Sequence, residues 1–131
     1  MSTGFFKVPK AKNEIVKSYR PGSSERKNVI KTYHEMINSY VEVPMYINGK
    51  DVKSKNKKTI SPPHDHQKIV GEYYIAEPEH IDQAIDSALA AKENWANMSW
   101  ESRSAIFLKA AELIAGPYRS KINAATMIGQ S

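Results

Sequence analysis

The residues best suited to bind a metal ion are His64, Asp65 and His66, which follow one another in a single polar stretch. Imidazole and carboxylate groups are common zinc ligands, but a tetrahedral site needs more donors than three adjacent residues can supply. No other histidine or any cysteine lies at the spacing of a zinc motif. The stretch separates two predicted strands, where polar turn residues are usually solvated. We therefore predict no metal site.

Residues that could act as a nucleophile and its base are also scarce. Thr32, Tyr33 and His34 are neighbours in sequence, but a nucleophile–base pair is defined in space, and the sequence identifies no partner for them. The chain has no cysteine, which excludes disulfides, thiolate metal ligands and a cysteine nucleophile within it. Any reaction that needs a thiolate must take it from outside these residues.

The sequence also contains no clear candidate residues for binding phosphate or stacking on a base. The six glycines lie at positions 4, 22, 49, 71, 116 and 129, so neither GxGxxG nor GxxxxGK[ST] occurs. Trp95 and Trp100 flank a predicted turn between two helices, where a packing role is expected for both. We assign no catalytic, cofactor-binding or metal-ligating residue to this chain.

The clearest structural element is a pair of amphipathic helices within residues 78–116. Apolar residues recur at three- and four-residue spacing, which predicts one buried stripe on each helix. The stripes are formed by Ile81, Ala84, Ile85, Ala88, Leu89 and Trp95, then by Ile106, Phe107, Ala110, Ala111 and Ile114. Ser99 is the predicted N-cap of the second helix, and Gly116, expected in the left-handed conformation, closes it before Pro117. This pattern predicts a helical hairpin with Arg103 and Lys109 outward.

The residues before this hairpin predict an extended arm, one helix and short strands. We expect the arm over 1–22, a helix capped by Ser23 or Ser24 that ends by Tyr40, and a final helix near 118–127. Strands are expected at 45–47, 57–61 and 68–76, with Asn48-Gly49 as a type I′ hairpin turn. The predicted organisation is therefore α+β, in three parts: arm and first helix (1–42), β-hairpin strands (43–77), and helical hairpin with the start of a third helix (78–131).

Composition allows an interaction module as an alternative. Of 131 residues, 40% are hydrophobic and 25% charged, and no apolar run reaches the length of a membrane span. The net charge of +5 is uneven, because residues 1–58 contain 13 Lys and Arg against 5 Asp and Glu. Such a basic half could bind nucleic acid or a larger protein partner. However, the lysines at 53, 55, 57 and 58 fall near a predicted hairpin without stacking aromatics between them, so we favour solvation over nucleic-acid binding.

Several motifs in this order resemble a known enzyme family. Ile81-Asp82-Gln83-Ala84-Ile85, Ala90-Ala91, Trp95, Arg103 and Ala110–Ile114 resemble the N-terminal helical hairpin of aldehyde dehydrogenases. Three arm segments resemble the branch that oxidises glutamate semialdehyde: Gly4–Pro9, Asn13–Val16 and Tyr19–Arg26. The same branch is indicated by Ser61–His66, Val70-Gly71, Phe107–Ala111 and Thr126–Gln130. The resemblance covers essentially the whole chain.

The resemblance implies an α/β parent enzyme, of which this chain would be an N-terminal fragment. A member of this branch uses a cysteine thiolate and NAD to oxidise L-glutamate 5-semialdehyde, formed from 1-pyrroline-5-carboxylate, to glutamate in proline degradation. The family's catalytic and NAD-binding residues lie beyond the matched region, so the isolated chain is expected to be inactive. Its expected partner is the remainder of the dehydrogenase chain, in a homo-oligomer without membrane contact. We expect the protein to be located in the cytoplasm, with the mitochondrial matrix as the alternative. A truncated pseudo-enzyme that binds a full-length partner is a further possibility.

Overall fold

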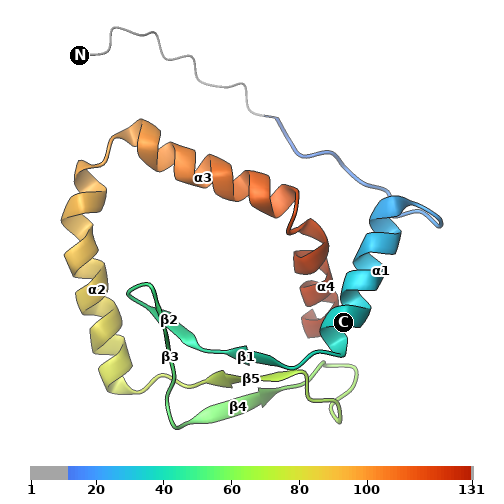
Figure 1. Ribbon diagram of the computed structural model, residues 1–131, viewed down its shortest axis with the longest axis horizontal. Coiled ribbons are helices and arrows are strands. Elements are labelled where there is room, and N and C mark those ends of the chain that lie inside the picture. The colour runs from blue at the N-terminus through green and yellow to red at the C-terminus, as the bar shows by residue number, and fades with distance from the viewer. Residues whose placement is uncertain (1–11, 131) are drawn as a thin grey trace, which may run out of the picture.

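The computed structural model describes residues 12–130, which Figure 1 shows as helices and short strands around an opening. The elements are α1 (Ser24–Ile37), β1 (Val41–Val43), β2 (Met45–Ile47), β3 (Lys50–Val52), β4 (Lys57–Ile60), β5 (Gly71–Tyr74), α2 (Pro78–Asn97), α3 (Trp100–Ala115) and α4 (Arg119–Gln130). This is the predicted α+β organisation. Residues 12–20 of the predicted arm contain neither helix nor strand, and the arm's first eleven residues lie outside the described part.

Helix α1 begins at the predicted cap and ends before the predicted limit. Ser23 is the N-cap, and its Oγ accepts a hydrogen bond from the Arg26 N–H at 3.4 Å. At the other end, Asn38 Nδ2 donates to the His34 carbonyl at 2.9 Å, and Ser39 Oγ donates to the Met36 carbonyl at 2.8 Å. These side chains satisfy the last carbonyls of the helix, which ends at Ile37. Tyr40, the predicted limit of the helix, is therefore outside it and exposed.

The main sheet contains three strands in the order β1–β5–β4. Strand β5 pairs antiparallel with β4 and parallel with β1, where Val41 is the register partner of Gly71. Strand β1 was not expected from the sequence. It is held partly by the Val41 N–H, which donates to the Val70 carbonyl at 3.0 Å. Gly71 is required here, because a Cβ atom at this position would lie 2.2 Å from the Val41 carbonyl oxygen.

Strand β5 is shorter than the predicted 68–76, although pairing continues on both sides of it. The Val70 N–H donates to the Ile60 carbonyl and the Ile75 N–H to the Asn56 carbonyl, each at 2.9 Å. The regular ladder covers only Gly71–Tyr74, because its antiparallel partner β4 is four residues long.

The predicted β-hairpin turn is confirmed. Strands β2 and β3 pair antiparallel, with Ile47 opposite Lys50. Between them, Asn48 and Gly49 have φ angles of 51° and 75°, as a type I′ turn requires. This two-stranded hairpin is separate from the main sheet and lies beside α2 (Figure 1).

Helices α2 and α3 are present with the predicted break, but they do not form the side-by-side hairpin that we expected. Figure 1 shows them diverging from their junction, so that they form two sides of the opening. Ser99 caps α3 as predicted, accepting a hydrogen bond from the Ser102 N–H at 3.2 Å. Only Met98 and Ser99 separate the two helices, and both have extended backbone conformations, with ψ angles of 138° and 149°. At the other end of α2, the Glu77 N–H donates to His80 Nδ1 at 3.1 Å, which completes a capping box.

The end of α3 also differs from the prediction. Gly116 has φ −106° and ψ −103°, so the expected left-handed conformation is wrong. Glycine is favoured here because it lets the backbone of residue 116 lie close to the Glu112 carbonyl oxygen. Its N–H donates to the Glu112 carbonyl at 3.0 Å, and a Cβ atom would lie 2.9 Å from that oxygen. Helix α4 then begins at Arg119, in agreement with the predicted final helix.

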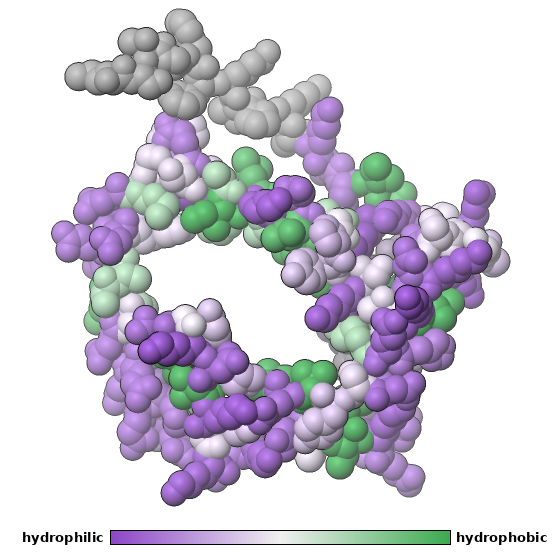
Figure 2. Space-filling model, viewed as in Figure 1, coloured by the Kyte–Doolittle hydropathy of each residue, from purple (hydrophilic) through white to green (hydrophobic). Residues whose placement is uncertain are grey.

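The core of the described residues is small and lies where α1 and α4 pack together and near the main sheet. Its buried apolar residues are Val29, Val70, Ala124 and Ile128, with Pro62 fully buried. Neither α2 nor α3 contains a buried residue. Figure 2 shows that the opening passes through the space-filling molecule, so the described elements enclose it without filling it.

Candidate functional site

The residues considered from the sequence for metal binding or catalysis do not form a site. Among residues 12–130 there is no group of three His, Cys, Asp or Glu side chains placed to hold a metal ion. Thr32 Oγ1 donates to the Asn28 carbonyl of its own helix at 2.9 Å, so it is not directed at a base. Tyr33 and His34 contact each other edge to face. Trp95 contacts Phe107, which is the packing role expected for it. Trp100, for which packing was also expected, is 55% exposed, because the described residues place nothing over the start of α3.

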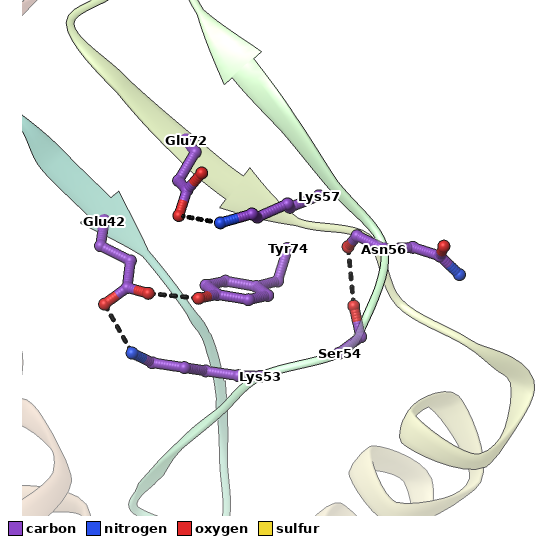
Figure 3. Close-up of polar contacts among 7 residues, drawn as sticks. All are labelled: Glu42, Lys53, Ser54, Asn56, Lys57, Glu72 and Tyr74. Atoms are coloured by element: carbon purple, nitrogen blue, oxygen red, sulfur yellow. Dashed lines mark hydrogen bonds and ion pairs between the residues drawn. The ribbon is translucent and has the colours of Figure 1, made fainter.

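A polar cluster that was not expected from the sequence joins the main sheet to the loop between β3 and β4 (Figure 3). Lys53 Nζ lies 2.5 Å from Glu42 Oε2, and the Tyr74 hydroxyl donates to the other oxygen of the same carboxylate. The Lys53 ammonium also lies 5.6 Å from the centre of the Tyr74 ring. Hydrogen bonds from Lys53 and then Tyr74 lower the pKa of Glu42, while the bond to Glu42 raises the pKa of both Lys53 and Tyr74.

A second ion pair crosses from β4 to β5. Lys57 Nζ lies 2.7 Å from Glu72 Oε1, and this bond lowers the pKa of Glu72 and raises that of Lys57. Partial desolvation and then a hydrogen bond with Glu72 raise the pKa of Tyr40. All these shifts favour the ordinary charge states at neutral pH. A general acid or base needs a pKa near the working pH, so the cluster joins strands and is not suited to proton transfer.

The loop between β3 and β4 is tied to the start of α2. Ser54 Oγ lies 2.8 Å from the carbonyl oxygens of Asn56 and Ile75. Asn56 Nδ2 donates to Glu77 Oε1 at 3.0 Å, so the same loop reaches the N-cap residue of α2. Together with the ion pairs of Figure 3, these bonds fix the direction in which α2 leaves the sheet.

A contact over a long sequence distance joins the arm to α4. The Tyr19 hydroxyl accepts hydrogen bonds from Asn123 Nδ2 at 2.8 Å and Arg119 Nε at 3.3 Å. Arg119 also donates to the Ile15 carbonyl at 3.0 Å and lies 3.8 Å from a Glu14 carboxylate oxygen. We call Tyr19, Arg119 and Asn123 the Tyr19 clasp. In the sequence, only the position of Tyr19 before an Arg-Pro-Gly turn distinguishes it, and that position carries no information about α4.

A mostly apolar groove of about 490 Å³ lies beside the Tyr19 clasp, between α1 and α4. It is lined by Tyr19, Arg26, Val29, Ile30, Asn123, Thr126 and Met127. A second groove, of about 450 Å³, lies between β2 and α2 and is bordered by Ile81 and Ile85. Both grooves present more apolar than polar surface, so they suit protein contacts better than a charged ligand.

A further exposed feature is what we call the α2–α3 apolar surface. It consists of Ile81, Ile85, Leu89 and Trp95 of α2 with Ile106, Phe107 and Ile114 of α3. Each of these side chains is between 40% and 66% exposed, although the spacing is that of a buried stripe. Figure 2 shows apolar residues along α3 beside the opening. Contiguous apolar surface of this kind indicates an interaction site.

The described residues do not fit a dinucleotide. Gly22, Gly49, Gly71 and Gly116 lie in separate turns and strands. Within residues 12–130, no glycine-rich loop leads into a helix N-terminus that could hold a pyrophosphate. None of the helices within residues 12–130 is both long enough and apolar enough to cross a bilayer. The described residues instead form an open arrangement of helices and strands with uncovered apolar faces. We call residues 12–130 the frame.

Comparison with known proteins identifies the origin of this frame. The sequence profile described as "Aldehyde dehydrogenase family" matches residues 49–128, more than half of the chain. The chain belongs to the aldehyde dehydrogenase family. The resemblance noted in the sequence is thereby confirmed.

Individual aldehyde dehydrogenases match over nearly the whole chain. The chain is 44% identical over 126 residues to the Delta-1-pyrroline-5-carboxylate dehydrogenase of Agaricus bisporus, which is 95% of this chain and 23% of that one. It is 40% identical to the mitochondrial enzyme of that name from Emericella nidulans, over 95% of this chain and 22% of that one. The chain therefore spans less than a quarter of the length of these relatives.

The fold also recurs in a solved aldehyde dehydrogenase structure. The Delta-pyrroline-5-carboxylate dehydrogenase of Mycobacterium tuberculosis, bound with NAD and cobalamin, superposes with a TM-score of 0.94 at 33% sequence identity. The match covers 100% of this chain and 24% of that one. The open frame described above is thus also the shape of a corresponding part of a much longer chain.

Proposed function

We propose that this chain forms the N-terminal part of an NAD-dependent dehydrogenase that oxidises L-glutamate 5-semialdehyde to glutamate in proline degradation. The observation that carries the proposal is the 44% identity over 126 residues to a Delta-1-pyrroline-5-carboxylate dehydrogenase. Agreement in fold with a second enzyme of that name, bound with NAD, supports it independently. The substrate is the aldehyde formed when 1-pyrroline-5-carboxylate opens by hydrolysis.

Within such an enzyme, the proposed role of residues 1–131 is structural. The ion pairs of Figure 3 fix α2 to the sheet, the Tyr19 clasp fixes the arm to α4, and the α2–α3 apolar surface is left for further protein. The proposed parts remain residues 1–42, 43–77 and 78–131. NAD binding and the reacting groups are assigned to protein outside these residues, because the chain has neither a cysteine nor a fitting glycine-rich loop. The 131 residues alone are proposed to be inactive.

The proposed partners are the remainder of the dehydrogenase and further copies of it in a homo-oligomer. Nucleic-acid binding is less well supported, because Lys53 and Lys57 are engaged with Glu42 and Glu72 and are not free for phosphates. Location in the cytoplasm stays a prediction, with the mitochondrial matrix as the alternative. The Emericella nidulans relative is named as mitochondrial.

A chimeric enzyme tests the proposal. The matching 126 residues of the Agaricus bisporus dehydrogenase are replaced by this chain, and NADH formation is followed with glutamate semialdehyde and NAD⁺. We expect the chimera to be active and the isolated 131 residues to give no NADH above the blank. The same chimera with Gly71→Val serves as the control for a disrupted β1–β5 pair. A soluble but inactive chimera, or an active isolated chain, contradicts the proposal.

A further inference from the structure

We propose that the α2–α3 apolar surface is an interface that holds the remaining part of an aldehyde dehydrogenase subunit, and that it can do so without a covalent link. This inference rests on the proposed function, since it takes the partner to be the rest of such an enzyme. The contacts that bind the partner are made by the stripes of the two helices and by one cationic side chain between them.

The two helices lack the packing that would keep them folded. Neither the 20 residues of α2 nor the 16 of α3 include a buried side chain. Isolated helices of this length are marginal in water, and most helical stability in proteins comes from burial of an apolar face. Since the described residues provide little cover for these faces, a protein partner must supply it.

The two stripes form one continuous surface. Trp95, near the end of the α2 stripe, contacts Phe107 of the α3 stripe edge to face, with ring centroids 6.5 Å apart. Ile85 and Leu89 continue the surface along α2, and Ile114 extends it along α3, at successive turns of each helix. A partner that occupies the space between the diverging helices can therefore contact both stripes, which meet at Trp95 and Phe107.

Arg103 indicates the polar chemistry of the partner. It lies three residues before Ile106, hence on the same face of α3, and it is only partly exposed, although the sequence predicted it to point outward. Its backbone N–H donates to the Ser99 carbonyl at 3.1 Å, but within the described residues the Arg103 guanidinium forms no hydrogen bond or ion pair. A partly desolvated guanidinium at an interface calls for a carboxylate or carbonyl acceptor. The partner's face should therefore be apolar with one such acceptor facing Arg103.

The occupant is the rest of the subunit, because the frame keeps its shape where that rest is present. The Mycobacterium tuberculosis dehydrogenase matches all of this chain at a TM-score of 0.94, and the match accounts for only 24% of that protein. The frame thus has the same form in a chain whose larger part lies outside it. Binding of that remaining part would give α2 and α3 the burial that the described residues do not provide, and this burial favours association of the two separate chains.

Co-expression of two separate chains tests the inference. Tagged residues 1–131 are produced together with the Agaricus bisporus dehydrogenase that lacks its matching 126 residues. We expect the longer chain to co-purify in equal amount. Ile106→Asp should lower the co-purified amount at least about tenfold, because burial of one isoleucine corresponds to such a factor. Arg103→Met, which keeps a good helix former and removes the guanidinium with its charge and donors, should also lower it.

Leu108→Asp is the matched control. Leu108 is in the same helix and is 61% exposed, against 50% for Ile106, but it lies on the opposite face of α3. Its replacement should leave co-purification within about twofold of the original. Circular dichroism of each variant shows whether its helices are retained.

The outcomes separate this inference from the proposed function. If the fused chimera is active but the separate chains stay apart, the interface proposal fails and the proposed function stands. If the fused chimera is inactive, the proposed function fails. The interface proposal is also overturned if residues 1–131 pair only with a second copy of themselves, or if Leu108→Asp and Ile106→Asp reduce co-purification equally.

Discussion

Replacement of Gly71 by alanine should open the parallel pair between β1 and β5. Gly71 is buried, and its neighbours at short range are backbone atoms of Val41, which cannot rotate away as a side chain could. The new Cβ would lie 2.2 Å from the Val41 carbonyl oxygen, 3.1 Å from its carbonyl carbon and 3.2 Å from its nitrogen. Strand β1 must therefore move by about 1 Å, which is enough to strain a hydrogen-bonded pair.

Forced overpacking of this kind costs about 1–3 kcal/mol. A cost of about 2 kcal/mol raises the equilibrium constant for local opening about thirtyfold, since 1.4 kcal/mol corresponds to a factor of ten. Strand β1 has no other partner strand among the described residues, so the loss should be concentrated in residues 41–43 and 71–74.

Hydrogen exchange followed by mass spectrometry measures this effect segment by segment. Peptides that contain β1 and β5 should lose protection in Gly71→Ala by about thirtyfold, while peptides from α4 should change little. Gly129→Ala is the control, because nothing lies within 4 Å of its added Cβ and alanine is the better helix former. Unchanged protection of β1 in Gly71→Ala would refute the argument from close approach.

Three further predictions use the other contacts of the frame. Tyr19→Phe leaves Arg119 and Asn123 without their shared acceptor and should weaken attachment of the arm by about 1–2 kcal/mol. Limited proteolysis should then cut faster within residues 12–20. Tyr46→Phe is the control and should have no effect on this rate. The folded-state pKa of Glu42 is depressed, so its stabilising contribution is present above the unfolded pKa of about 4.3 and is lost as the pH falls through the folded pKa. The urea midpoint of unfolding should therefore decline in that pH range. The decline should be less steep in Glu42→Gln. Each uncovered large apolar side chain of α2 and α3 forgoes about 1.5–3 kcal/mol of burial, so the isolated chain should self-associate in light scattering; a sharp, reversible unfolding transition of a monomer would contradict this.

Local signals predicted the elements well. Ser23 and Ser99 cap the helices they were expected to cap, and Asn48-Gly49 makes the expected turn, because capping and turn formation depend on residues within four positions of one another. The end of α3 was located correctly at Gly116, but its conformation was wrong. A left-handed cap and a tight carbonyl approach both favour glycine, and the sequence does not distinguish them.

Contacts between distant residues were not accessible from the sequence. Strand β1 is three residues long, and its parallel pairing with β5 depends on a close approach at Gly71 that no local pattern reveals. The pairing of Lys53 with Glu42 and of Tyr19 with Asn123 likewise joins residues whose separation in sequence is 11 and 104. The stripes of α2 and α3 were predicted correctly, whereas their exposure follows from what surrounds them and not from the stripes themselves.

The Tyr19 clasp has a consequence for synthesis on the ribosome. Tyr19 and Arg119 are 100 residues apart, so at a translation rate of about 5–20 residues per second the arm emerges about 5–20 s before its partner. Throughout that interval Tyr19 has no α4 to bind, and the groove face of α1, with Val29 and Ile30, is uncovered in the nascent chain. A chaperone that recognises apolar segments would therefore have this interval in which to bind α1, and its release would coincide with the appearance of α4.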